Sequence, residues 1–341
     1  TMQIWPREVD STTKTCCGLS AIEDARRVAY RLGIPHYVLN FRDIFAEKVI
    51  DNFCREYGLG RTPNPCIRCN RFIKFGALLE KARELGADFI ATGHHARIET
   101  DNNGIPQLKK GADQHKDQSY FLYSLTREQL GHSLMPVGNH TKSEVREIAA
   151  RLGLEVASKP GSQEICFIPD DNYAGFLEEH MPDTANPGPI LDTEGHVLGE
   201  HRGIQFYTIG QRRGLHLAAG EPRYVVGIEP ERNTIVIGRR EDAFADELIT
   251  SNLNWLTIDK LEHPITVSAR VRYRHPEAKA EISPLDEDRV RVRFDEPQFA
   301  VTPGQAVVFY DGDIVVGGGT IERAERKWAV RGHALSGIRH A

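Results

Sequence analysis

Two cysteines separated by two residues, Cys66 and Cys69, are the side chains in this sequence best suited to chemistry. They follow Asn64-Pro65 and precede a segment with helical spacing of apolar residues. Amide dipoles at the start of a helix lower the pKa of a thiol and favour the thiolate, which attacks sulfur or binds metal. The pattern therefore predicts redox, persulfide or three-cysteine cluster chemistry, and the alternative is a pair of cysteines in a turn without a role.

Cys166 is the third thiol that fits such chemistry. A second pair with the same spacing would favour structural zinc, but the sequence has only this additional candidate. The other thiols are expected to be buried and without a role, and a disulfide framework is not expected in a long chain without a secretion signal. These other cysteines are Cys16, Cys17 and Cys54.

Two polar segments downstream suit a nucleotide or nucleic-acid ligand. Gly93, His94 and His95 follow a predicted strand, and the carboxyl edge of a parallel sheet is where α/β proteins bind ligands. The segment 116–120, Lys-Asp-Gln-Ser-Tyr, could contact phosphate and bases. The alternative is a glycine needed only for the turn, with histidines that are merely exposed.

Arginines alternate with apolar residues near the C-terminus. Ser268, Arg270, Arg272 and Arg274 would place three guanidinium groups on one strand face, beside the ring of Tyr273. Such a stripe can bind a phosphate backbone. A second stripe comprises Arg289, Arg291 and Arg293, and the alternative for both is a solvated face neutralised by Glu281, Asp286 and Asp288.

The elements that must position these side chains alternate in type over the first half of the chain. The spacing predicts helices over 20–33, 44–57 and 71–85, strands over 36–40 and 88–92, a hairpin over 96–110, and a capped helix from Thr141 to Gly153. This alternation is typical of a parallel α/β sheet.

In the second half of the chain the sequence pattern predicts short strands and turns. We expect a nucleotide-binding catalytic domain over 1–168, a central β-rich domain over 169–245 with a hairpin from 223–229 and 233–238, and a C-terminal β-barrel over 246–327. The tail, 328–341, is expected to be disordered.

Composition narrows the class of protein. The 341 residues are 40% hydrophobic and 27% charged, as in folded globular proteins, and the formal charge of −5 gives no overall basic signature for a nucleic-acid partner. Neither a membrane span nor a secretion signal is recognisable, so we expect a cytoplasmic protein without a membrane partner.

Taken together, the motifs resemble those of the tRNA-specific 2-thiouridylase family, in order and spacing, over nearly the whole chain. They are Gly60-Arg61-Thr62-Pro63-Asn64-Pro65, Cys69-Asn70, Ile73-Lys74-Phe75, Ala91-Thr92-Gly93-His94, Lys116-Asp117-Gln118-Ser119-Tyr120-Phe121-Leu122, Ile165-Cys166-Phe167, Tyr207-Thr208-Ile209-Gly210-Gln211-Arg212-Arg213-Gly214-Leu215, Val301-Thr302-Pro303-Gly304-Gln305 and Gly317-Gly318-Gly319.

The resemblance implies ATP-dependent replacement of the C2 oxygen of the wobble uridine of tRNA by sulfur. Family members use ATP with Mg²⁺ to adenylate that oxygen, and sulfur from a donor protein or a cysteine desulfurase relay then displaces AMP. By the family pattern Cys69 is the nucleophile, Cys166 the persulfide carrier, and Met2 and Gly93 contact adenosine. Asn64, Pro65 and Cys66 border the target base, and the implied tRNA contacts are His94, Lys116, Asp117, Gln118, Arg272, Tyr273 and Gln305.

Two departures from the family pattern leave alternatives open. Many members carry aspartate at the position of Cys66, so Cys66, Cys69 and Cys166 could instead hold a [4Fe-4S] cluster with one open iron for sulfur. The family's Ser-Gly-Gly-Val-Asp-Ser pyrophosphate loop does not occur in the sequence. We therefore expect a PP-loop ATPase-like domain that lacks its first strand, with a missing upstream segment as the favoured explanation. The alternative is a non-catalytic tRNA-binding or sulfur-carrier remnant without ATP activation.

Overall fold

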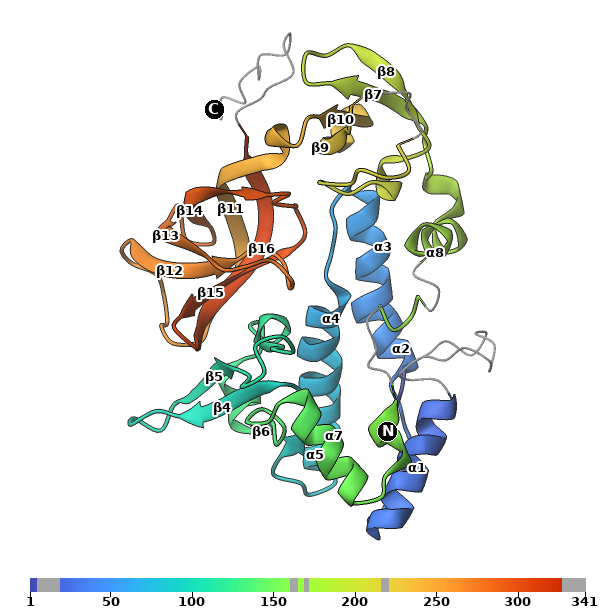
Figure 1. The fold of residues 1–341 in the computed structure, drawn as a ribbon, viewed down its shortest axis with the longest axis vertical. Helices are drawn as coiled ribbons and strands as arrows, with labels where there is room; N and C mark the ends of the chain where they lie inside the picture. The colour runs from blue at the N-terminus through green and yellow to red at the C-terminus, as the bar shows by residue number, and fades with distance from the viewer. Residues whose placement is uncertain (5–18, 160–164, 169–171, 216–220, 327–341) are drawn as a thin grey trace.

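The N-terminal half of the chain alternates helices with short parallel strand pairs (Figure 1). A computed structural model describes residues 1–4, 19–159, 165–168, 172–215 and 221–326. Strand β1 (Met2–Gln3) pairs in parallel with β2 (Leu39–Asn40), and β3 (Ile90–Ala91) pairs in parallel with β6 (Ser133–Leu134). The α/β prediction is confirmed, although the predicted strands at 36–40 and 88–92 are paired over only two residues each.

The helices lie close to their predicted positions with one instructive difference. Helix α1 covers Leu19–Leu32, and α2 (Arg42–Phe45) continues through a π-helical stretch, Ala46–Ile50, into α3 (Asp51–Gly58). The next helix, which we call the cysteine helix, begins six residues earlier than predicted. It comprises α4 (Pro65–Arg68), π-helical Cys69–Ala77 and α5 (Leu78–Glu84). Proline fits the first helical position, where its missing N–H costs nothing, and Asn64 caps the start.

The segment between the cysteine helix and the β-rich half contains a hairpin and short helices. Strands β4 (Ala96–Thr100) and β5 (Pro106–Lys110) form the predicted hairpin, and β5 pairs with the barrel at Lys109 and Ile314. Helix α7 (Lys142–Arg151) carries the predicted capping box between Thr141 and Glu144. The remaining helices are the 3₁₀ turn Ser119–Phe121, α6 (Arg127–Gly131), the 3₁₀ turn Glu155–Ser158 and α8 (Tyr173–His180).

A four-stranded sheet with the order β8-β7-β10-β9 forms the central part. Its strands are β7 (Gly188–Asp192), β8 (Val197–His201), β9 (Tyr224–Glu229) and β10 (Thr234–Gly238), with 3₁₀ turns at Pro182–Thr184, Ile204–Phe206 and Pro230–Arg232. The predicted hairpin of β9 and β10 is confirmed.

The C-terminal strands close into the predicted small barrel. After a 3₁₀ turn at Glu241–Ala243, they are β11 (Phe244–Trp255), β12 (Ile265–Arg270), β13 (Ala278–Pro284), β14 (Val290–Phe299), β15 (Ala306–Asp311) and β16 (Ile314–Glu325). The order is β11-β14-β13-β12-β15-β16, and β16 pairs back with β11. Closure leaves no free edge between these strands.

The predicted face of three guanidinium groups is wrong, because β12 ends at Arg270. Val271 is buried and the chain then turns, with the N–H of His275 donating to the carbonyl oxygen of Arg272 at 3.0 Å. Arg272 and Arg274 therefore lie in a turn beyond the strand. In the second stripe Arg291 and Arg293 do alternate with buried residues of β14, whereas Arg289 precedes the strand and pairs with Asp286, as the solvated-face alternative expects.

Two apolar cores enclose the cysteine helix. Cys69 and Ile73 join a core built from α2, α3 and the central sheet. Ile67, Phe75 and Leu79 join a second core with the β4–β5 hairpin and the barrel. The spacing of these residues places each set on its own side of the helix, so the helix is held between the other parts of the protein. In the described part of the chain no helix is long and apolar enough to cross a membrane.

Candidate functional site

The start of the cysteine helix is fixed by Asn64. Its side-chain oxygen accepts a hydrogen bond from the N–H of Cys66 at 3.2 Å, which caps the first turn. Cys66 is exposed in that turn, and Cys69, one turn later, is only 8% exposed. The two thiols thus differ in access, because one faces solvent and the other faces the core.

Cys166 packs against the same apolar core as Cys69. It is half-buried, and its neighbour Phe167 makes edge-to-face contacts with the rings of Phe45 at 5.8 Å and Phe53 at 5.3 Å. Aromatic side chains therefore belong to the core that contains Cys69 and contacts Cys166. An apolar environment of this kind suits a sulfur that must not be lost to hydrolysis.

The residues present do not fit a [4Fe-4S] cluster. Over the described ranges, no three or more His, Cys, Asp or Glu side chains are grouped so that they could hold a metal ion. Cys66, Cys69 and Cys166 are all described, and they do not form such a group.

Cys54 on α3 has a different character. Burial, followed by the nearby Asp51 carboxylate, raises the pKa of its thiol to about 11. The thiol is therefore protonated at neutral pH. It is half-buried, whereas the sequence predicts a buried thiol. Cys16 and Cys17 lie outside the described residues.

The loop before the cysteine helix is held from both β-rich domains. The N–H of Thr62 donates to the carbonyl oxygen of Pro303 at 2.9 Å, and its hydroxyl lies 3.2 Å from that of Thr208. Gln305 donates from Nε2 to the carbonyl oxygens of Thr62 at 2.9 Å and Pro63 at 3.4 Å. Gln305, a predicted tRNA contact, is thus placed where it orients the loop that leads to Asn64.

Tyr273 brings the barrel to the exposed cysteine. The turn after β12 packs the ring of Tyr273 against that of Phe121, with ring centroids 4.3 Å apart and the ring planes tilted by 40°. Burial raises the pKa of Tyr273, and the negative charges of Asp117 and Cys66 add to the rise. Tyr273 is therefore within electrostatic reach of Cys66, and its neighbour Arg272 is exposed.

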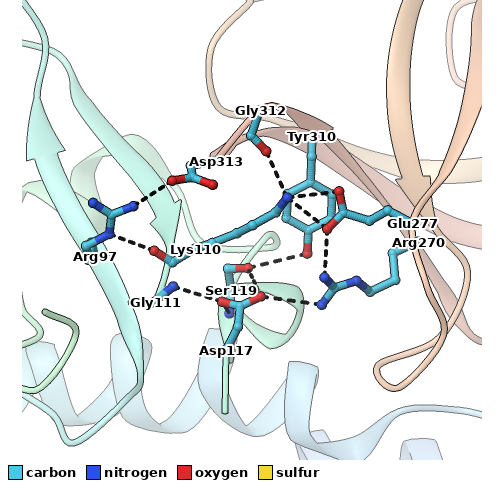
Figure 2. Close-up of polar contacts among 10 residues, drawn as sticks. All are labelled: Arg97, Lys110, Gly111, Asp117, Ser119, Arg270, Glu277, Tyr310, Gly312 and Asp313. Carbon is cyan, nitrogen blue, oxygen red and sulfur yellow. Dashed lines mark hydrogen bonds and ion pairs between the residues drawn. The ribbon is translucent and has the colours of Figure 1, made fainter. Parts of the chain in front are cut away.

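A buried polar network fixes the barrel against the β4–β5 hairpin (Figure 2). The Asp117 carboxylate accepts from the N–H groups of Gly111 and Ser119, both at 3.1 Å, and pairs with Arg270 at 3.4 Å. Arg270 also pairs with Glu277 at 2.7 Å, and Lys110 reaches the same carboxylate at 2.8 Å. The network joins residues that are far apart in the sequence.

Two of the predicted binding residues belong to this network. Asp117 is only 4% exposed, and its carboxylate accepts hydrogen bonds inside the protein, so its contact with tRNA stays a prediction. Arg270 is likewise engaged inside the protein and is not part of a binding face. The sequence analysis did not identify Glu277 and Lys110 as members of this network. The position of Glu277, seven residues after Arg270, was the signal in the sequence that could have indicated the ion pair.

The predicted segment at 93–95 is only partly open. Gly93 is exposed after β3, but His94 is 7% exposed, and its Nδ1 lies 2.9 Å from the Thr92 hydroxyl. Burial, with Lys74 and His95 adding to it, lowers the pKa of His94 to about 3. The imidazole of His94 is therefore neutral and buried, and its contact with tRNA stays a prediction.

The remaining predicted residues are placed as follows. Lys116 is exposed, and Gln118 is half-buried and accepts from the N–H of His95 at 2.9 Å. Met2 is half-buried on β1, which belongs to a different strand pair from the one that Gly93 follows.

Three family descriptions match successive parts of the chain. Residues 1–170 match the tRNA methyl transferase HUP domain, residues 174–239 match the tRNA methyl transferase PRC-barrel domain, and residues 245–321 match the aminomethyltransferase beta-barrel domain. Together they cover most of the chain.

Curated relatives are similar over nearly the full length. The tRNA-specific 2-thiouridylase MnmA of Acetivibrio thermocellus is 57% identical over 94% of this chain and 91% of its own length. The proteins of the same name from Halothermothrix orenii and Clostridium perfringens are each 53% identical over 94% of this chain and 90% of their own lengths.

Proposed function

The chain belongs to the tRNA-specific 2-thiouridylase family, and from this membership we propose that it is a tRNA-uridine 2-sulfurtransferase acting in the cytoplasm. Its substrates are the wobble uridine of tRNA, ATP and a persulfide sulfur from a donor protein or a cysteine desulfurase relay. The observation that carries the proposal is the shared apolar core of Cys69 and Cys166 beneath the exposed Cys66.

The first step activates the base. The C2 oxygen of uridine attacks the α-phosphorus of ATP, which is supplied with Mg²⁺, and pyrophosphate leaves. Oxygen is a poor leaving group until it is bound to phosphorus, so adenylation supplies what the sulfur step needs. Met2 and Gly93 are the proposed adenosine contacts. Asn64, Pro65 and Cys66 border the base at the capped start of the cysteine helix.

The second step transfers sulfur. The outer sulfur of a persulfide on Cys166 attacks C2, and AMP leaves with the former C2 oxygen. The Cys69 thiolate then attacks the inner sulfur of Cys166, which breaks the S–S bond and leaves sulfur on the base. A Cys69–Cys166 disulfide results, and two external thiols reduce it to two cysteine thiols while they are oxidised to a disulfide. The apolar core beside Cys166 would protect the persulfide from hydrolysis.

The tRNA is expected to lie across the exposed Lys116 and the turn that carries Arg272 and Tyr273. Tyr273 offers a ring for stacking beside Cys66, and the guanidinium of Arg272 suits a phosphate. Gln118 and Gln305 support the loops at this surface.

The experiment compares cysteine variants in cells that lack the gene. Complementation with Cys69→Ser or Cys166→Ser should give no 2-thiouridine in tRNA by mass spectrometry, while wild type and the matched control Cys54→Ser restore it. Cys66→Ser should keep part of the activity. If wild type binds tRNA but gives no 2-thiouridine, the chain is a non-catalytic tRNA-binding or sulfur-carrying protein.

A further inference from the structure

We propose that Arg212 and Arg213 form a phosphate-binding surface through which the central domain grips the tRNA backbone near the target base. The proposal rests on the tRNA substrate proposed above and adds a third domain to its binding. Both arginines belong to the segment 207–215, to which the mechanism gives no part.

The loop that carries the two arginines is rigidly built. The side chain of Gln211 spans it, since Oε1 accepts from the N–H of Thr208 at 3.0 Å and Nε2 donates to the carbonyl oxygen of Arg213 at 3.0 Å. The backbone is also tied to β9, because Gly210 donates to the carbonyl oxygen of Val225 at 2.8 Å. A loop held in this way presents its side chains with little loss of entropy on binding.

The loop lies against the predicted target-base loop. The hydroxyl of Thr208 is 3.2 Å from that of Thr62. Thr62 lies four residues before Cys66, and Thr208 lies four before Arg212. Figure 1 shows the central sheet at the end of α3 from which the chain leads to α4. A tRNA whose wobble base reaches Cys66 therefore passes the arginine loop with its neighbouring nucleotides.

The charges of these arginines are not neutralised. Both side chains are exposed, and over the described residues neither has a carboxylate within ion-pair distance or any hydrogen-bond acceptor. Two other arginines of the central domain are paired, Arg202 with Glu178 at 3.0 Å and Arg232 with Glu229 at 3.0 Å. An exposed guanidinium without a partner keeps its donors for a phosphate, which it binds in a bidentate manner.

The other two domains each carry an exposed cation near the predicted tRNA surface. Lys116 and Arg272 also lack an ion-pair partner among the described residues. With Arg212 and Arg213, each domain contributes uncompensated positive charge to the surroundings of the cysteine helix. This explains how a chain with a net charge of −5 can bind RNA.

The test is binding of an unmodified tRNA transcript with uridine at the wobble position, measured at several salt concentrations with the full chain. The double variant Arg212→Ala/Arg213→Ala should raise Kd about tenfold and reduce the slope of log Kd against log salt by about one per arginine. The charge-matched control is Arg26→Ala/Arg151→Ala, which removes two exposed arginines on α1 and α7, at the far end of the molecule in Figure 1. It should leave both quantities near wild type.

Two further outcomes separate this inference from the proposed function. Arg212→Lys/Arg213→Lys should bind tRNA with most of the wild-type affinity, because lysine keeps the positive charge. The affinity should stay somewhat below that of wild type, because lysine cannot bind a phosphate in a bidentate manner. If the wild-type protein and the double alanine variant bind tRNA equally well, the phosphate-binding surface is overturned and the proposed function is not. Wild type that binds no tRNA would overturn both.

Discussion

The side-chain amide of Gln305, in the barrel, donates a hydrogen bond to the carbonyl oxygen of Thr62 at 2.9 Å, across 243 positions of the sequence. Two residues after Thr62, Asn64 caps the helix that carries Cys66 and Cys69. The orientation of the cysteine helix start therefore depends on the barrel, and a domain remote in sequence shapes the chemistry of the thiols.

Replacement of Gln305 should affect the rate more than tRNA binding. Gln305→Ala removes one hydrogen bond worth about 1 kcal/mol and loosens the loop at 61–64, so single-turnover thiolation at saturating tRNA should slow about tenfold. Gln305→Glu should be at least as slow, because a carboxylate cannot donate to the Thr62 carbonyl. A weaker Kd for tRNA with an unchanged rate would instead show that Gln305 touches the tRNA.

Gly304 allows the close approach of the barrel to the same loop. Its φ is +90°, and a Cβ there would lie 2.9 Å from the Thr62 nitrogen and 3.0 Å from the Arg61 Cβ. Gly304→Ala should lower the free energy of unfolding by about 2 kcal/mol or more, through backbone strain and this contact. Gly312→Ala is the matched control, because its φ is +56° and nothing lies within 4 Å. Equal losses in denaturant unfolding would show that the contact with Thr62 contributes nothing.

Arg270 should be far more important for stability than the exposed Arg291 of the barrel. Its side chain is 15% exposed and it neutralises Asp117, which is 3% exposed. Arg270→Ala leaves the Asp117 carboxylate without its cation and should cost about 3 kcal/mol in urea unfolding. Arg291→Ala breaks an ion pair in which Arg291 is 47% exposed, and should cost less than about 1 kcal/mol. Similar costs for the two variants would contradict a structural role for the network in Figure 2.

Local patterns were sufficient to predict the alternation of helices and strands, the β4–β5 and β9–β10 hairpins, and the capping box at Thr141. Each of these features depends on residues only a few positions apart, so residue propensity and the spacing of apolar residues are enough to predict it. The cysteine helix begins earlier than its apolar spacing indicates, because Pro65 occupies the first helical turn, where proline is well suited.

Site predictions depended on exposure, which a single sequence does not record. Asp117 and His94 carry polar side chains in motif positions, and tertiary packing buries both of them. Arg270 alternates with apolar residues just as a solvent-facing residue would, yet Glu277 and Asp117 draw it inside. The partners that decide these cases lie on other elements, beyond the reach of local spacing.

The buried His94 should make the protein sensitive to mild acid. In the unfolded chain its pKa is near the ordinary 6.5, while burial lowers it to about 3 in the folded protein. Below pH 6.5 His94 is protonated in the unfolded state but stays neutral in the folded state, so the free energy of unfolding falls as the pH falls from about 6.5 towards 3. Between pH 7 and pH 5 this one group should lower the free energy of unfolding by about 2 kcal/mol.

The measurement is the free energy of unfolding of wild type and His94→Asn at both pH values. The variant cannot titrate at this position, so its stability should fall by about 2 kcal/mol less than that of wild type. Equal losses in the two proteins would mean that His94 is protonated in the folded state.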